Sequence, residues 1–185
     1  EAFTISEYLT VKDKNNNVLY RPTVHYAYCP SDSAIASLYE LKMNHYKRPT
    51  VTRTLTNEII SGKDILGCLI MGHDYEAWWI GSILDIDEAR KIHPYHNATV
   101  LQVSISIISA IIWMIKNPNK GINYPDNLPY DEIISLCYPY LGEFVSLPVK
   151  WNPLIGISQE KEFGDYYNKE LSSNEDKWQF SSFLI

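Results

Sequence analysis

The sequence predicts an α+β fold, in which a largely antiparallel or mixed sheet carries helices packed on one face. Segments rich in β-branched and aromatic residues dominate the first half of the chain, and helical spacing of apolar residues dominates the second half. No glycine-rich turn of the GxGxxG or GxxxxGK[ST] type is present, so the sequence lacks a recognisable phosphate cradle for a nucleotide. Its 185 residues, 45% of them hydrophobic, suffice for a domain with a substantial core.

The first predicted elements are a hairpin and a strand. The polar run 13–17 separates two apolar segments, which indicates a turn between paired strands. Residues 18–28 are predicted to form a strand, with Tyr26 and Tyr28 on one face and His25 on the other, because successive side chains of a strand alternate.

A helix is predicted over residues 32–44. Pro30 ends the strand, Ser31 and Asp32 are residue types that cap helices, and apolar residues follow at helical spacing. Three further strands are predicted at 50–56, 66–71 and 77–84. The last two are close enough in sequence to form a second hairpin.

Two helices are predicted to follow. The first, over 85–92, opens with an aspartate and has Glu88 three residues later, an aspartate version of a capping box. The second runs from Asn97, as its cap, to Lys116. Its β-branched content and the alternation over 102–107 leave a strand as an alternative, although the length favours a helix.

The last third of the chain predicts a helix over 130–138 and an edge strand over 144–149. The residues from 155 to 185 are polar and irregular, and we expect a tail there. Because Glu1 starts the sequence without an initiator methionine, we also expect the chain to be part of a longer one.

Composition narrows the class of protein. A net charge of −6 argues weakly against a nucleic-acid partner and is compatible with a cationic ligand. The three cysteines are widely spaced, which predicts reduced thiols in a cytoplasmic protein. The apolar run 100–115 is short for a bilayer and contains four polar residues, so we expect a buried element and no membrane contact.

Two residues near the end of the predicted strand could carry chemistry. His25 could exchange protons near neutral pH, although a histidine in this position is more often structural. Asp32 could face a cationic substrate or could simply cap its helix, and one carboxylate can do only one of these fully.

Other polar and aromatic residues are weaker candidates. Trp78 and Trp79 point to opposite faces of a strand, so at most one of them lines a given pocket, where it could hold an amine. Asn97 and Thr99 begin the long helix and could contact a ligand, although capping alone explains Asn97. No metal site is expected, because the pair of histidines at 93 and 96 lacks a nearby third ligand.

Several long segments resemble the bacterial type of homospermidine synthase, in that family's order. They are YRPTVHYAYCPSDSA (20–34), NEIISGKDILGCLIMGHDYEAWWIGSILDIDEAR (57–90), HNATVLQV (96–103), WMIKNP (113–118), PYLGEF (139–144) and WNP (151–153). The resemblance covers roughly residues 18–154 and corresponds to the C-terminal portion of those enzymes. It implies that residues 1–154 are a substrate and catalytic domain, related to saccharopine dehydrogenases, that accompanies a separate Rossmann-type NAD domain.

The resemblance also implies a reaction. In this family NAD is a recycled prosthetic group. A putrescine amine is oxidised to an imine, a second putrescine displaces ammonia, and the hydride is returned to give homospermidine. Spermidine can serve as the aminobutyl donor in some members, and a homodimer is the family's expectation.

Placed on the matching segments, the reaction suggests a role for each candidate. We expect His25 to act as the proton shuttle and Asp32 to hold an ammonium group. Tyr26, Tyr28 and Trp79 are expected to line the substrate site. Asn97 and Thr99 are expected to contact the nicotinamide or the substrate.

Two alternatives remain at this point. One is a related NAD(P)-dependent dehydrogenase acting on carboxynorspermidine or saccharopine, whose carboxylates would need arginines. The chain has only four arginines, and none is an evident pocket residue, which favours a diamine. The other is a non-catalytic polyamine-binding or dimerisation module.

Overall fold

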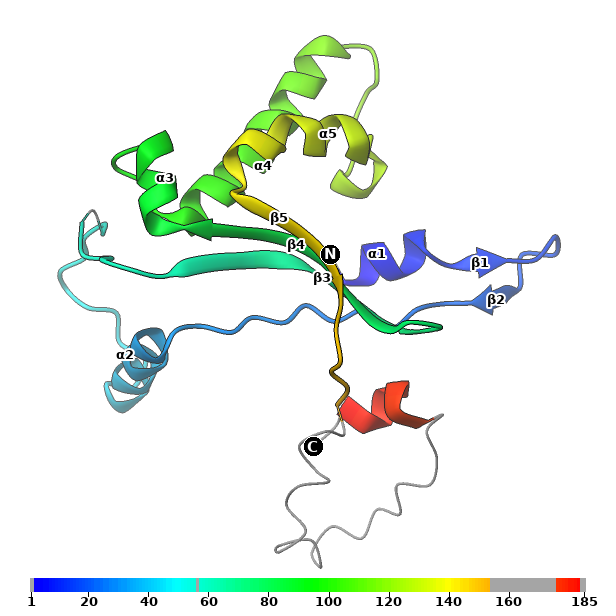
Figure 1. Cartoon of the computed structure of the whole chain (residues 1–185), viewed down its shortest axis with the longest axis horizontal. Helices are drawn as coiled ribbons and strands as arrows, with labels where there is room; N and C mark the ends of the chain where they lie inside the picture. The colour runs from blue at the N-terminus through cyan, green and yellow to red at the C-terminus, as the bar shows by residue number, and fades with distance from the viewer. Residues whose placement is uncertain (1, 56, 154–175, 184–185) are drawn as a thin grey trace, which may run out of the picture. The chain divides into compact units, whose positions relative to one another are not determined.

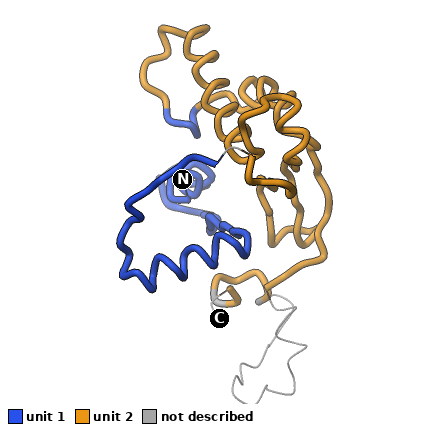
Figure 2. Tube along the Cα trace, turned by 90° about the vertical axis from the view of Figure 1, so that its left-hand side faces the viewer, with its two compact units in different colours: residues 1–55, 124–127 blue, residues 56–123, 128–185 orange. Residues whose placement is uncertain are grey.

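The computed structural model describes residues 2–55, 57–153 and 176–183. The chain forms two compact units (Figure 2). Unit 1 comprises residues 1–55 and 124–127, and unit 2 comprises residues 56–123 and 128–185. The sequence predicted a different division, into a domain over 1–154 and a tail over 155–185, and this division stays a prediction.

Unit 1 begins with helix α1 (Ala2–Tyr8) and a small antiparallel hairpin of β1 (Val11–Lys12) and β2 (Val18–Tyr20). Asp13 organises the turn, because its carboxylate accepts hydrogen bonds from the backbone N–H groups of Asn15 and Asn17, both at 2.8 Å. A hydrogen bond from the Asn17 side chain, together with these backbone bonds, holds the pKa of Asp13 below its usual value. The predicted hairpin is confirmed.

The predicted strand over 18–28 is wrong beyond Tyr20. Residues 21–31 are not part of any sheet, and the chain passes along them toward α2 (Asp32–Met43) (Figure 1). A strand needs a partner for its backbone groups, and Pro22 lacks an N–H to offer one. The strand predicted at 50–56 is also absent over residues 51–55, where no neighbouring strand pairs with the chain.

Helix α2 matches its prediction closely. Its N-cap is Ser31, whose hydroxyl accepts a hydrogen bond from the Ala34 N–H at 3.3 Å. However, none of its residues is buried, and the same holds for every described residue of unit 1. The buried core of the described chain therefore lies wholly in unit 2.

Unit 2 is built on a three-stranded antiparallel sheet with the order β3-β4-β5 (Figure 1). The strands are β3 (Lys63–His73), β4 (Glu76–Asp85) and β5 (Glu143–Pro148). The predicted hairpin of the first two strands and the predicted edge strand are confirmed. Together with the helices they confirm the α+β class.

Three α-helices accompany this sheet in the described part of unit 2. They are α3 (Ile86–Ile92), α4 (Ala98–Lys116) and α5 (Tyr130–Cys137), each within one or two residues of its prediction. The side chain of Asp85 caps α3 through the Asp87 N–H at 2.8 Å. The strand alternative for the long apolar run is wrong, because its length and its asparagine cap both favour a helix.

Two small clusters form the core of unit 2. Leu84 packs with Ala89, Ala98 and Leu101, and so joins β4 to α3 and α4. The second cluster joins α4 to α5 and the residues after it, and consists of Ile105, Cys137, Leu141 and Ile133.

A polar contact links the helix layer to the sheet between these clusters. Gln102 is 1% exposed, and its Nε2 donates to Ser82 Oγ at 3.0 Å and to the Leu141 carbonyl at 3.4 Å. Gln102 therefore fixes which face of α4 meets the sheet.

The β3–β4 hairpin depends on a facing pair of glycines, Gly67 and Gly81. A Cβ on Gly67 would lie 2.5 Å from the Ile80 carbonyl oxygen and 2.6 Å from a ring carbon of Trp79. The first of these neighbours is backbone, so the strands would have to separate to admit a methyl group.

Gly67→Ala should therefore lower the free energy of unfolding by about 1–3 kcal/mol, the usual range for overpacking. The measurement is urea denaturation followed by tryptophan fluorescence. Cys68→Ala is the matched control, because Cys68 is the next residue along β3 and is exposed. Equal midpoints for the two variants would contradict the close approach of the strands.

The long apolar helix α4 differs from its prediction in one respect. The sequence predicts a buried element, yet only 33% of its most apolar window is buried inside the structure. Within the described residues it is also the one helix long and apolar enough to cross a membrane, a test that core helices of soluble proteins pass as well. Its face away from the core is thus available for another surface.

Most of the predicted tail, residues 155–175 and 184–185, lies outside the described residues. Residues 176–183 form two short 3₁₀ turns, η4 (Asp176–Trp178) and η5 (Phe180–Phe183). Lys177 Nζ meets a carboxylate oxygen of Glu76 at 2.7 Å, which lowers the pKa of Glu76. Trp178 packs over Gly72, so this segment contacts the tip of the β3–β4 hairpin.

Candidate functional site

Four of the predicted site residues lie on one short stretch of unit 1. His25, Tyr26 and Tyr28 occupy the segment between β2 and α2, and Asp32 begins α2. All four are exposed, with Tyr26 at 73% and Tyr28 at 77%. His25 is therefore accessible to a ligand and is not part of a packed core.

The structure shows that Asp32 is not the N-cap of its helix. Because Ser31 caps α2, the carboxylate of Asp32 does not have that task. It lies instead in the first turn of the helix, where the N-terminal end of the helix dipole stabilises a negative charge. An ionised carboxylate in this place could attract an ammonium group.

The other three predicted residues belong to unit 2. Asn97 caps α4, because its Oδ1 accepts a hydrogen bond from the Val100 N–H at 2.8 Å. Thr99 follows it in the first turn and is exposed. Trp79 is half-buried and covers Gly67 on the sheet face opposite Ser82 and α4. Trp78 points to the other face, where its Nε1 donates to Ser146 Oγ at 2.9 Å.

His25, Tyr26, Tyr28 and Asp32 thus follow one another along a single stretch of unit 1, and Trp79, Asn97 and Thr99 lie in unit 2. The capping role of Asn97 is observed, and it leaves the amide NH₂ of that side chain available. The catalytic and binding roles of all seven residues stay predictions.

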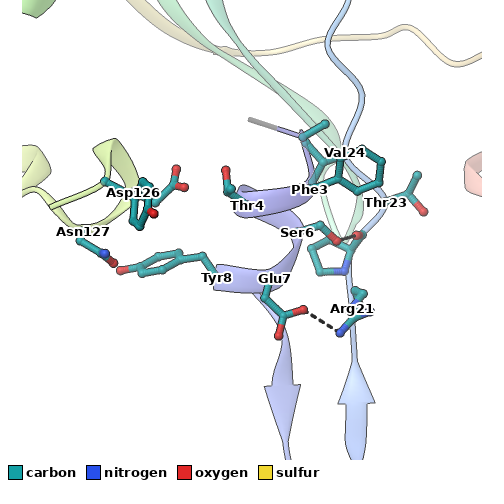
Figure 3. A pocket seen from close by; sticks show the side chains of 13 residues that line it. Phe3, Thr4, Ser6, Glu7, Tyr8, Arg21, Thr23, Val24, Asp126 and Asn127 are labelled. Carbon is teal, nitrogen blue, oxygen red and sulfur yellow. Dashed lines mark hydrogen bonds and ion pairs between the residues drawn. The ribbon is translucent and has the colours of Figure 1, made fainter. Parts of the chain in front are cut away.

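Unit 1 also contains a pocket that the sequence did not indicate (Figure 3). Its volume is about 920 Å³, and it lies among α1, the chain after β2 and the turn η1 (Pro125–Asn127). Three aromatic side chains line it: Phe3, Tyr8 and Tyr124. The pocket joins segments more than 100 residues apart in sequence, so no local pattern could have predicted it.

Two carboxylates line this pocket, and they differ in their partners. Glu7 is engaged with Arg21 at 2.9 Å, shown by the dashed line in Figure 3, and with Lys12 at 3.4 Å. Asp126 lies across the pocket from this ion pair and is half-buried. Aromatic faces and a carboxylate are the groups that hold organic cations, so the pocket suits a protonated amine.

The pocket and the histidine segment adjoin one another. Thr23 and Val24 line the pocket, and His25 is the next residue along the chain. No group of three or more His, Cys, Asp or Glu side chains within the described ranges is arranged to hold a metal ion. The exposed imidazole of His25 and the half-buried carboxylate of Asp126 are groups that can serve acid–base chemistry and cation binding.

These features define an α+β domain with an accessible histidine, an accessible carboxylate and an amine-compatible pocket, whose sequence has no glycine-rich nucleotide turn. Over its whole length the chain is 38% identical to the homospermidine synthases of Blastochloris viridis and of Mesorhizobium japonicum. The predicted resemblance to homospermidine synthases is confirmed. No protein-family profile matches the chain.

A solved structure agrees with the sequence comparison. The crystal structure of the homospermidine synthase from Legionella pneumophila in complex with NAD matches 97% of the chain with a TM-score of 0.82 and 44% sequence identity. The chain spans 37% of the length of that protein and of both curated relatives. This share fits the predicted correspondence to a C-terminal portion of such an enzyme.

Proposed function

We propose that this chain is the substrate-binding part of a homospermidine synthase, an NAD-dependent enzyme that transfers an aminobutyl group between putrescine molecules and releases ammonia. The observation that carries the proposal is the identity of 38% over the entire chain to two proteins of that name. The likeness to a third, solved with NAD, supports it.

Within this proposal four residues of unit 1 and Trp79 of unit 2 handle the diamine. His25 removes the proton that would otherwise block oxidation of a putrescine ammonium, and returns it later in the cycle. Asp32 holds the ammonium at one end of the diamine through charge attraction. Tyr26, Tyr28 and Trp79 offer aromatic faces to the cationic substrate.

NAD would supply the hydride acceptor and donor for this chemistry. Asn97 and Thr99 fit a contact with the nicotinamide, because the Asn97 amide can donate while its oxygen caps α4 and the Thr99 hydroxyl is exposed. A pyrophosphate cradle has no counterpart in the sequence, so these two residues would hold only the nicotinamide end.

The arginines disfavour the dehydrogenase alternative. A carboxynorspermidine or saccharopine substrate needs free guanidinium groups for its carboxylates. Arg21 is bound to Glu7 at 2.9 Å and to Thr10 at 3.0 Å, and Arg90 donates to the Ile59 carbonyl at 2.7 Å. Two of the four arginines are therefore already engaged.

We also propose that the protein is cytoplasmic and homodimeric, with spermidine as a possible second donor and with neither nucleic acid nor membrane as a partner. The three cysteines are unpaired, with two of them exposed, which suits a reducing compartment.

The test is to incubate the full-length protein with putrescine and NAD and to analyse the products by mass spectrometry. Homospermidine and ammonia in equal amounts are expected. A protein that binds NAD and putrescine but forms no product would support the binding-module alternative and refute the proposed reaction.

Asp32→Asn should raise the KM for putrescine about tenfold with a smaller change in kcat, because it removes a charge that binds the substrate before and during the reaction. Steady-state kinetics of the full-length protein would measure this. Glu40→Gln is the control, since Glu40 is an exposed carboxylate on the same helix and should leave the KM unchanged. Equal KM values for the two variants would remove Asp32 from the site.

A further inference from the structure

Among the residues that the structure describes, the outer face of α4 is an exposed aliphatic surface. Seven of its side chains are between 40% and 73% exposed, and they are Val100, Val103, Ile107, Ile108, Ile111, Met114 and Ile115. No charged residue occurs in α4 before Lys116. We call these seven side chains the α4 face. Contiguous apolar surfaces of this kind mark interaction sites.

The opposite face of the helix is fixed in the fold. Gln102 Nε2 donates to Ser82 Oγ at 3.0 Å, and Cys137 Sγ lies 3.2 Å from Ser109 Oγ. Both polar contacts are buried, and Ser109 is fully covered. Since α4 could not enter a bilayer as a spanning helix without breaking them, only the α4 face is free to meet another surface.

The size and chemistry of the α4 face favour a second copy of the protein. Its side chains expose on the order of 600 Å², which approaches the ~800 Å² that each partner contributes to a standard interface. Interfaces between domains of one chain are more polar than those of obligate dimers, whereas the α4 face is aliphatic and uncharged and has the partly exposed hydroxyl of Ser104 beside it. A surface without charge can also meet its own copy without repulsion.

The spacing along the helix fits a paired arrangement. Val100, Val103, Ile107 and Met114 follow the three- and four-residue steps of a helix–helix seam, and Ala110 continues the seam with a small side chain. In an antiparallel pair about a two-fold axis, the middle of the helix meets itself. Ile107 lies at that middle position.

We propose that two copies associate through the α4 faces, antiparallel about a two-fold axis that passes near Ile107. The proposal rests on the homodimer suggested above and gives it a surface, but it does not depend on the reaction.

The mass of the full-length protein in solution, measured by analytical ultracentrifugation, tests the surface. A dimer is expected, and Ile107→Glu should weaken it by about 100-fold or more, because it places two carboxylates against each other near the axis. Ile65→Glu is the matched control, because Ile65 is 60% exposed and lies on the sheet face away from α4. It should leave the dimer intact.

A cross-link tests the same surface without weakening it. In a Cys29→Ser and Cys68→Ser background, Ile107→Cys should form a disulfide between two copies under mild oxidation, and Ile65→Cys should not. This variant keeps the proposal falsifiable if Ile107→Glu fails to fold.

Each other outcome contradicts the proposed dimer contact and shows what the α4 face does instead. A dimer that Ile107→Glu leaves intact and Ile107→Cys does not cross-link would retain the homodimer but through another face. If the Ile107→Cys variant is a monomer and its introduced thiol does not react with maleimide, another part of the same polypeptide covers the α4 face. A monomer that co-sediments with phosphatidylcholine vesicles would assign the face to lipid. Homospermidine formation is measured separately, so its presence or absence leaves these readings unchanged.

Discussion

His25→Ala should lower the turnover of putrescine by about 10²–10⁴-fold, the usual contribution of a positioned general base. The reason is that a diamine is protonated at neutral pH, and hydride can leave only from the carbon next to an unprotonated nitrogen. The expected signature is a fall in kcat with little change in KM. Added imidazole should restore part of the activity, which a merely structural role would not predict.

His45→Asn is the control for this experiment. His45 lies in the same unit and has a backbone φ of 55°, a conformation that asparagine tolerates well. Its imidazole has no assigned role, so the variant should turn over at close to the unmodified rate. If both variants lost activity equally, or if His25→Ala retained it, the proton shuttle would lie elsewhere.

Leu84→Ala should be the most destabilising single truncation in unit 2, with a loss of about 2–5 kcal/mol in the free energy of unfolding. Leu84 is 0% exposed and contacts residues of α3 and α4. Its removal would leave a cavity where the sheet meets both helices. Urea denaturation measures the loss, with the midpoint as the readout.

Leu66→Ala is a matched truncation on the neighbouring strand. Leu66 is 49% exposed, and the same change there should cost less than about 1 kcal/mol. Similar losses at the two positions would mean that the core of unit 2 is not centred on Leu84.

Local chemistry made the regular elements of unit 2 predictable. Asp85 and Asn97 are residue types that cap helices, and both do so. The hairpin of β3 and β4 was predictable because the two predicted strands are separated by only a few residues. Signals of this kind act within a few residues, so they survive without knowledge of the tertiary structure.

Unit 1 was less predictable because its shape depends on contacts that sequence patterns do not encode. The apolar and aromatic residues after Tyr20 read as a strand, yet no neighbouring strand in the described part of the chain pairs with them. The helix α1 has neither a cap signal nor a wide apolar stripe, and it was missed. The pocket beside it was missed as well, because Tyr124 and Asp126 come from a distant turn.

The candidate site divides in the same way. The exposure of His25 and the release of Asp32 from capping are structural findings that favour the predicted roles. Trp79, Asn97 and Thr99 lie in unit 2, and their proposed roles rest on the resemblance alone.

The absence of buried side chains among residues 2–55 and 124–127 has a consequence for any assay. A segment that buries so little apolar surface gains little hydrophobic free energy from within, so the order of the imidazole-bearing stretch must be reinforced by whatever covers it. Ligand and cofactor would then strengthen the protection of these amides against hydrogen exchange as they bind. Recognition of the diamine and ordering of unit 1 would then be a single thermodynamic event.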